Sequence, residues 1–130
     1  MATIEETIFA RCTTHAGISA LIDARCYPER LPENVTYPAL VYTRISSSAA
    51  QFRTHELESV GLDDARFQFD SYAETSKGAK DLADQVFAAW DGYRDECVVG
   101  YARQVNRRAT RQDSINVYRE ISDVMMIYST

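Results

Sequence analysis

Residues 65–73 alternate apolar and polar side chains and lead directly into a segment with helical periodicity. A strand repeats every two residues, so Phe67 and Phe69 fall on one face and the polar side chains on the other. The sequence therefore predicts a strand with one face in a core. The other face is free for water, a channel or a neighbouring subunit, and it carries Gln68, Asp70 and Tyr72.

Apolar spacing elsewhere predicts two helices and further strands. Steps of three and four residues predict helices over 4–26 and 75–92, with Pro28 and Pro32 ending the first and opening a loop. Good strand formers predict three more strands, over 39–46, 97–106 and 116–128. Turn clusters flank the segment 51–60, which has two interpretations, an extended hairpin or a long loop. The arginine-rich segment 107–114 is expected to connect the last two strands.

This order of elements predicts an α+β fold. A helix between blocks of hairpin-connected strands indicates a mostly antiparallel sheet of about four strands, with two helices packed on one face. The 130 residues contain no linker or repeat, which predicts a single domain over 1–130. The start of the chain has no signal-like apolar block and no apolar run is long enough to span a membrane, so we expect a cytoplasmic protein with no membrane partner.

The composition excludes several functions. A net charge of −5 argues against broad nucleic-acid binding, because phosphate contacts need clustered cations. The three cysteines Cys12, Cys26 and Cys97 are widely spaced and form no C-x-x-C motif, so buried thiols are expected rather than disulfides or zinc. Phosphate-binding glycine motifs are absent, and we expect no cofactor.

Catalytic and metal interpretations find little support. Cys12 and His15 lie three residues apart and could join Cys26 and His55 around a metal, but Cys12 belongs to an apolar stripe and the spacing fits no tetrahedral site. A serine nucleophile in 46–48 lacks its G-x-S-x-G elbow. The acidic pairs 63–64 and 95–96 adjoin turn signals and are expected to be solvated. The sequence thus predicts no catalytic and no metal-binding residues.

The arginines form the other candidate site. Four of them lie within nine residues around the expected hairpin tip: Arg103, Arg107, Arg108 and Arg111. Such a cluster suits a phosphate or an acidic protein surface, or serves as a charged hairpin that discourages edge-to-edge aggregation. Because the chain is acidic and the cluster lacks interleaved aromatic residues, we favour a protein contact.

Several segments together resemble the phage tail completion family. They are Arg25-Cys26-Tyr27-Pro28, Tyr37-Pro38-Ala39-Leu40-Val41-Tyr42, the central set His55, Leu57, Gly61, Leu62, Ala65, Arg66, Gln68, Asp70, Tyr72 and Ala73, the helix 76–90, and the closing set Tyr118, Arg119, Asp123 and Tyr128. Together they run through nearly the whole chain in the order and spacing of that family.

The resemblance implies a non-enzymatic virion protein. Members of this family form a ring, typically a hexamer, that caps the tail tube, ends tail elongation and joins the tail to the head connector, while DNA passes through the hole. It implies a place in the virion tail, after assembly in the host cytoplasm. The predicted self, tube or connector contacts are His55, Gln68, Asp70, Tyr72 and the four arginines.

Two alternatives remain open from the sequence. One is a head-closure ring, which would act one ring nearer the capsid. The other is a small α+β enzyme or ligand-binding domain with a pocket lined by Tyr42, Tyr72, Trp90 and Tyr101, although aromatic residues of this kind are more simply core and interface residues.

Overall fold

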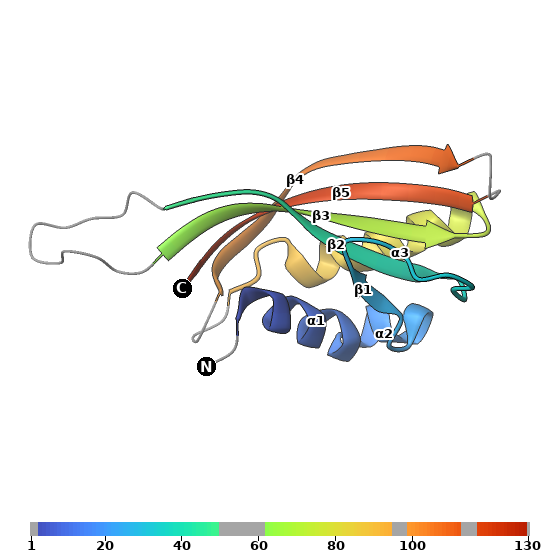
Figure 1. Cartoon of the computed structure of the whole chain (residues 1–130), viewed down its shortest axis with the longest axis horizontal. Helices are drawn as coiled ribbons and strands as arrows, with labels where there is room; N and C mark the ends of the chain where they lie inside the picture. Colours follow the sequence, from blue (N-terminus) through green and yellow to red (C-terminus); the bar gives the residue numbers. More distant parts are fainter. Residues whose placement is uncertain (1–2, 50–61, 95–98, 113–116, 130) are drawn as a thin grey trace, which may run out of the picture.

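The computed structural model describes residues 3–49, 62–94, 99–112 and 117–129 (Figure 1). Within these ranges the chain forms three helices: α1 (Ile4–Thr14), α2 (Ala16–Ile22) and α3 (Ser76–Trp90). The same ranges contain five strands: β1 (Cys26–Pro28), β2 (Ala39–Ala49), β3 (Leu62–Ala73), β4 (Val99–Gln112) and β5 (Val117–Ser129).

The strands form one sheet in the order β1-β2-β3-β5-β4. All neighbours are antiparallel except β1, which pairs parallel with β2. The α+β class is confirmed, but the sheet is mixed and has five strands, not four antiparallel ones. The missed strand is β1: its three residues are too few to show a period, and its Pro28 indicated a loop.

The predicted first helix, 4–26, is wrong in extent, because it breaks at His15 and its last residue lies in β1. The backbone of His15 is extended; its N–H donates to the Arg11 carbonyl at the end of α1, and its Nδ1 accepts the N–H of Ile18, 3.4 Å away, at the start of α2. The apolar spacing continues through both helices, so periodicity alone did not show the break.

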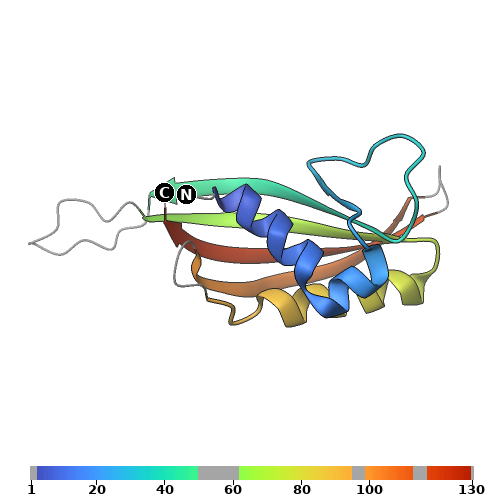
Figure 2. The ribbon, with the colours of Figure 1, turned by 90° about the horizontal axis from the view of Figure 1, so that it is seen from below.

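The three helices pack on one face of the sheet: α3 runs along the β4 side, and α1 crosses the face from the β2 side at its start towards α3 (Figure 2). The apolar face of β3 forms the centre of this core, as predicted. Phe69 stacks on Trp90 of α3 with ring centroids 5.7 Å apart, and Phe67 meets Tyr128 of β5 edge to face at 6.5 Å. Trp90 also contacts the ring of Tyr93 at 5.4 Å.

The arginine-rich segment 107–114 is mostly strand, which corrects the prediction of a connection there. β4 continues to Gln112 and remains paired with β5 throughout, with Arg107 opposite Ser122 and Arg111 opposite Tyr118. The segment contains no glycine or proline to end the ladder. Similarly, β2 and β3 are an antiparallel pair from Ala39 to Ala49 and from Asp63 to Tyr72. The choice between a hairpin and a long loop for residues 51–60 lies outside the described residues.

Candidate assembly surface

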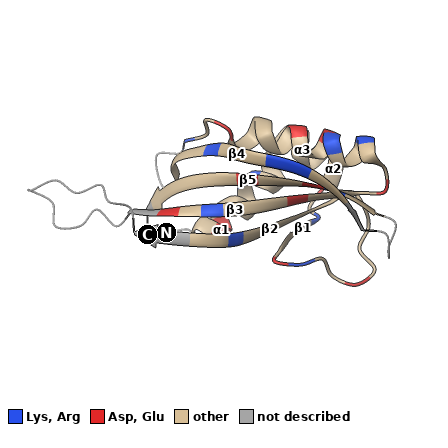
Figure 3. Ribbon diagram, turned by 90° about the horizontal axis from the view of Figure 1, so that it is seen from above, with Lys and Arg blue, Asp and Glu red and all other residues tan. Residues whose placement is uncertain are grey.

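The face of the sheet opposite the helices carries no helix of the described chain (Figure 3). Gln68, Asp70 and Tyr72 of β3 lie on this uncovered face, as the alternation predicted. At one end of the face Tyr72 is buried in a small apolar cluster. The cluster contains Val41 of β2, Val117 of β5, and the side chains of Tyr27, Leu31 and Tyr37 in or near the β1–β2 connection. The rest of the face is mixed: charged and amide side chains share it with Tyr101, Ile121, Met125 and Ile127.

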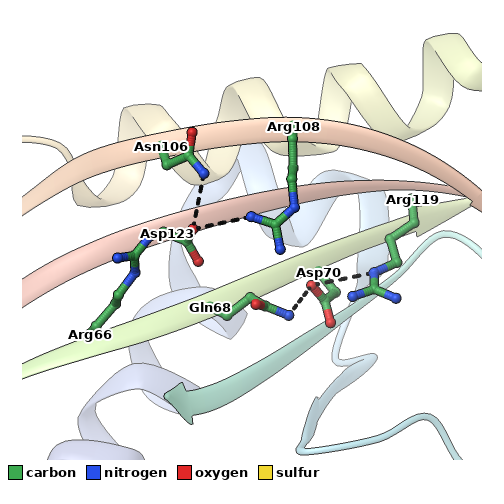
Figure 4. Close-up of polar contacts among 7 residues, drawn as sticks. All are labelled: Arg66, Gln68, Asp70, Asn106, Arg108, Arg119 and Asp123. Carbon is green, nitrogen blue, oxygen red and sulfur yellow. Dashed lines mark hydrogen bonds and ion pairs between the residues drawn. The ribbon is translucent and has the colours of Figure 1, made fainter. Parts of the chain in front are cut away.

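Asp123 of β5 is the centre of a polar network on this face (Figure 4). Its Oδ2 lies 2.8 Å from Nη2 of Arg66 on β3 and 3.6 Å from Nη1 of Arg108 on β4. The side-chain amide of Asn106 on β4 donates to the same oxygen at 3.3 Å. These donors leave Asp123 only 2% exposed although no further layer covers it. A buried carboxylate thus joins three strands.

Asp70 is the second buried carboxylate of the face. Gln68 donates its side-chain amide to Asp70 Oδ1 at 3.0 Å, and Nε of Arg119 lies 3.6 Å from the same oxygen. The Arg119 guanidinium also lies 5.8 Å from the centre of the Tyr72 ring. Burial raises the pKa of Asp70, an effect that Arg119 and the Gln68 bond only partly offset. The ionised form of Asp70 is therefore costly in the folded chain.

Because ionised Asp70 destabilises the fold, the effect of Asp70→Asn on stability should depend on pH. A raised carboxyl pKa contributes stability that is present below the unfolded pKa, near 4, and is lost as the pH rises through the folded pKa. We therefore expect Asp70→Asn, which cannot ionise, to raise the unfolding free energy more at pH 7 than at pH 4, by up to about 1 kcal/mol. Urea unfolding at pH 7 and pH 4 measures it. The gain should shrink at pH 4, and a larger gain at pH 4 would contradict this explanation.

The structure separates the four predicted arginines. Arg108 and Arg103 lie on the uncovered face, Arg108 beside Asp123 and Arg103 in a hollow that also includes Asp64, Tyr101, Met125 and Ile127. Arg107 lies on the helix side, with Nε 2.9 Å from Glu120 Oε1 and Nη1 2.8 Å from Asp84 Oδ1 of α3. The side chain of Arg111 and all of His55 are outside the described residues. The assignment of these residues to an interface remains a prediction.

The aromatic residues of the enzyme alternative do not converge on one pocket. Trp90 is in the core under the helices, Tyr72 is in the small cluster on the other face, and Tyr101 is 45% exposed. The proposed metal ligand His15 instead caps α2, while Cys12 and Cys26 are buried free thiols. The described residues hold no group of three or more metal-ligating side chains, and none of their helices is long and apolar enough to cross a bilayer.

The sequence did not predict the Asp123 network. It predicted only that this face of β3 is polar. Arg66, Asn106 and Asp123 meet because the register of three strands brings them together. One signal was present: Arg119 and Asp123 are charged residues four apart within the predicted strand 116–128, and therefore share a face. Their partners on other strands were not visible in the sequence.

These features define an α+β sheet protein whose candidate site is a sheet face with an ion-paired network around Asp123. A family model described as "Tail completion protein gp17" matches residues 6–129, nearly the whole chain. The chain therefore belongs to this phage tail completion family, as the sequence resemblance predicted.

A solved structure has a similar fold. It is a chain of the "Virion of native gene transfer agent (GTA) particle", with a TM-score of 0.67 and 12% sequence identity, and the alignment covers 95% of this chain and 92% of that one. At this identity the likeness concerns the fold alone. A comparison with curated proteins gives no match.

Proposed function

We propose that this chain is a non-enzymatic subunit of a ring that closes the tail tube of a phage or phage-derived particle. The ring ends tail elongation and joins the tail to the head connector or head-closure protein, with DNA passing through it. The main support for the proposal is the family match over residues 6–129. The match covers all five strands and all three helices of the described chain, apart from the first two residues of α1. The fold shared with a gene transfer agent virion chain supports it.

The uncovered face suits a fixed protein contact. Buried Asp123 holds Arg66 and Arg108 in place, while their side chains stay 39% and 54% exposed and keep N–H donors towards solvent. Guanidinium groups held in this way suit carboxylates of a partner surface, since little side-chain freedom remains to be lost on binding. The net charge of −5 would at the same time repel the phosphates of DNA in transit.

Growth of the cognate tail tube in the presence of this protein tests the proposed function. We expect added protein to bind tube ends and stop elongation, so that mean tube length falls as protein concentration rises. Cosedimentation with preformed tubes and with capsid portals separates the alternatives. Binding to portals but not to tubes would identify a head-closure ring instead, and unaffected growth without binding to either would contradict both functions.

Arg103 and Arg108 are expected to contribute to partner binding. Replacing both with Ala removes two exposed guanidinium groups from the uncovered face and should weaken binding to tube or connector about 10-fold. Arg30→Ala, an exposed arginine in the β1–β2 connection, is the matched control and should change binding less than about 2-fold. Equal binding by the double variant and the wild type would show that the contact lies elsewhere.

A further inference from the structure

β2 beyond its pairing with β1, and the edge strand β4, each carry a β-bulge with an exposed apolar residue. In β2, Arg44 and Ser46 face consecutive residues of β3, so Ile45 is extra; in β4, Gln104 and Asn106 face consecutive residues of β5, so Val105 is extra. Ile45 is 50% exposed and Val105 is 39% exposed. A bulge redirects its strand locally and weakens simple edge-to-edge strand pairing. The side chains at these edges therefore matter more for contacts than the backbone.

On the β2 side, α1 is linked to the strand next to the bulge and carries an exposed phenylalanine. Phe9 is 42% exposed and lies one turn after Glu5, on the same side of the helix. Oε1 of Glu5 lies 3.7 Å from Nη1 of Arg44, the residue just before Ile45. This ion pair directs that side of α1 towards the β2 edge. We call Phe9 and Ile45 the β2 patch.

The β4 side repeats the arrangement with α3. Phe87 is 44% exposed and shares a helix face with Asp84, which binds Arg107, and with Asp91, whose Oδ1 accepts the Gln104 N–H at 3.1 Å. Those contacts on β4 fall on either side of Val105, so Phe87 lies towards the same edge. We call Phe87 and Val105 the β4 patch. Figure 2 shows the start of α1 near β2 and α3 along β4, on the other side of the sheet.

An acidic hollow lies near one patch and an exposed lysine near the other. A hollow beside the β2 patch is lined by the carboxylates of Glu5 and Glu29 and by a single guanidinium, that of Arg44. Glu29 has no ion-pair partner among the described residues. Lys80 lies two turns before Phe87 on the same face of α3; it is exposed, and its ammonium likewise has no ion-pair partner in the described chain. The same face of α3 also carries Asp84, which binds Arg107, and Asp91, which accepts the Gln104 N–H, so Lys80 is the cation on this face that suits the acidic hollow on the other side of the sheet.

We propose that the β4 patch of one copy packs on the β2 patch of the next copy, with Lys80 of the first beside Glu29 and Glu5 of the second. The occupant of each patch is a second copy of this chain, because the two patches lie on opposite sides of the sheet, both are apolar, and the acidic hollow near one suits Lys80 near the other. Such a contact is head-to-tail, and it closes into a ring when the rotation between copies allows. The inference rests on the proposed ring function and assigns its subunit interface.

Complementary blocking variants test the interface. Phe9→Glu blocks only the β2 patch and Phe87→Glu only the β4 patch, and both positions are exposed on helices, so folding should be retained. By analytical ultracentrifugation, each variant alone should associate at least about 30-fold more weakly than the wild type. An equimolar mixture should form 1:1 dimers and nothing larger, because it contains one intact contact per pair. Tyr101→Glu, an equally exposed aromatic on the uncovered face, should associate like the wild type.

A charge exchange supplies an independent readout. Lys80→Glu and Glu29→Lys should each weaken association about 5-fold, and the two changes in one chain should restore it. If the chain with both changes associates as weakly as the single variants, Lys80 and Glu29 do not pair across the interface. A monomeric mixture of Phe9→Glu and Phe87→Glu, in conditions where the wild type associates, would overturn the whole interface.

Tail tubes separate this inference from the proposed function. If both blocking variants occupy tube ends as the wild type does, the interface is wrong while the function stands. If the wild type forms the predicted contact but ignores tubes, the interface stands and the function is wrong. A wild type that remains monomeric in solution and on tubes contradicts both.

Discussion

Trp90→Ala is expected to lower the free energy of unfolding by about 3–5 kcal/mol. Trp90 is fully buried and packs between the rings of Phe69 and Tyr93, so truncation leaves a large cavity where α3 meets the sheet. Its indole Nε1 has no hydrogen-bond partner among the described residues, so the loss is one of packing. Urea unfolding at pH 7, followed by circular dichroism, measures the change.

Phe87→Ala is the matched control for Trp90, since it truncates an aromatic residue three positions earlier on the same helix. Phe87 is 44% exposed, so the free chain should lose less than about 1 kcal/mol. Similar losses for the two variants would mean that α3 does not pack on the sheet through its Trp90 face.

Asp123→Ala is expected to lower the free energy of unfolding by about 2 kcal/mol. The change removes the shared acceptor of Arg66, Arg108 and Asn106 and leaves their donors unpaired on the uncovered face. The loss is smaller than for Trp90 because Arg66 and Arg108 are partly exposed and can bind water instead. Urea unfolding at pH 7 again gives the measurement.

Asp123→Asn keeps the shape and one acceptor oxygen but removes the charge, and should cost about half as much as Asp123→Ala. High salt should reduce the difference in unfolding free energy between Asp123→Asn and the wild type, because the arginines are partly solvated and salt screens their charge. If Asp123→Ala unfolds at the wild-type urea concentration, the network does not stabilise the sheet.

Local periodicity accounts for the parts of the fold that the sequence predicted. The alternation around Phe67 and Phe69 correctly assigned the two faces of β3, and the apolar spacing that includes Trp90 correctly placed α3. The break at His15, the short β1 and the extension of β4 depend on caps and pairing partners. Those are contacts between segments, which a repeat within one segment does not encode.

The candidate site also has a part that strand alternation predicted and a part that depends on contacts between strands. Gln68, Asp70 and Tyr72 lie on the uncovered face because strand alternation is a local property. Arg107 was grouped with Arg108 by adjacency in sequence, yet consecutive strand residues point to opposite faces, and Arg107 binds Asp84 and Glu120 under the sheet. The two edge patches depend on bulges in β2 and β4, whose positions follow from cross-strand register.

Electron microscopy of cognate tail tubes incubated with this protein shows whether the chain closes the tail. We expect a single closed ring of this chain at one end of each tube, with the tube walls bare. Absence of the protein from tube ends, or its binding along the walls or only to capsid portals, would contradict the assignment as the tail-closing ring.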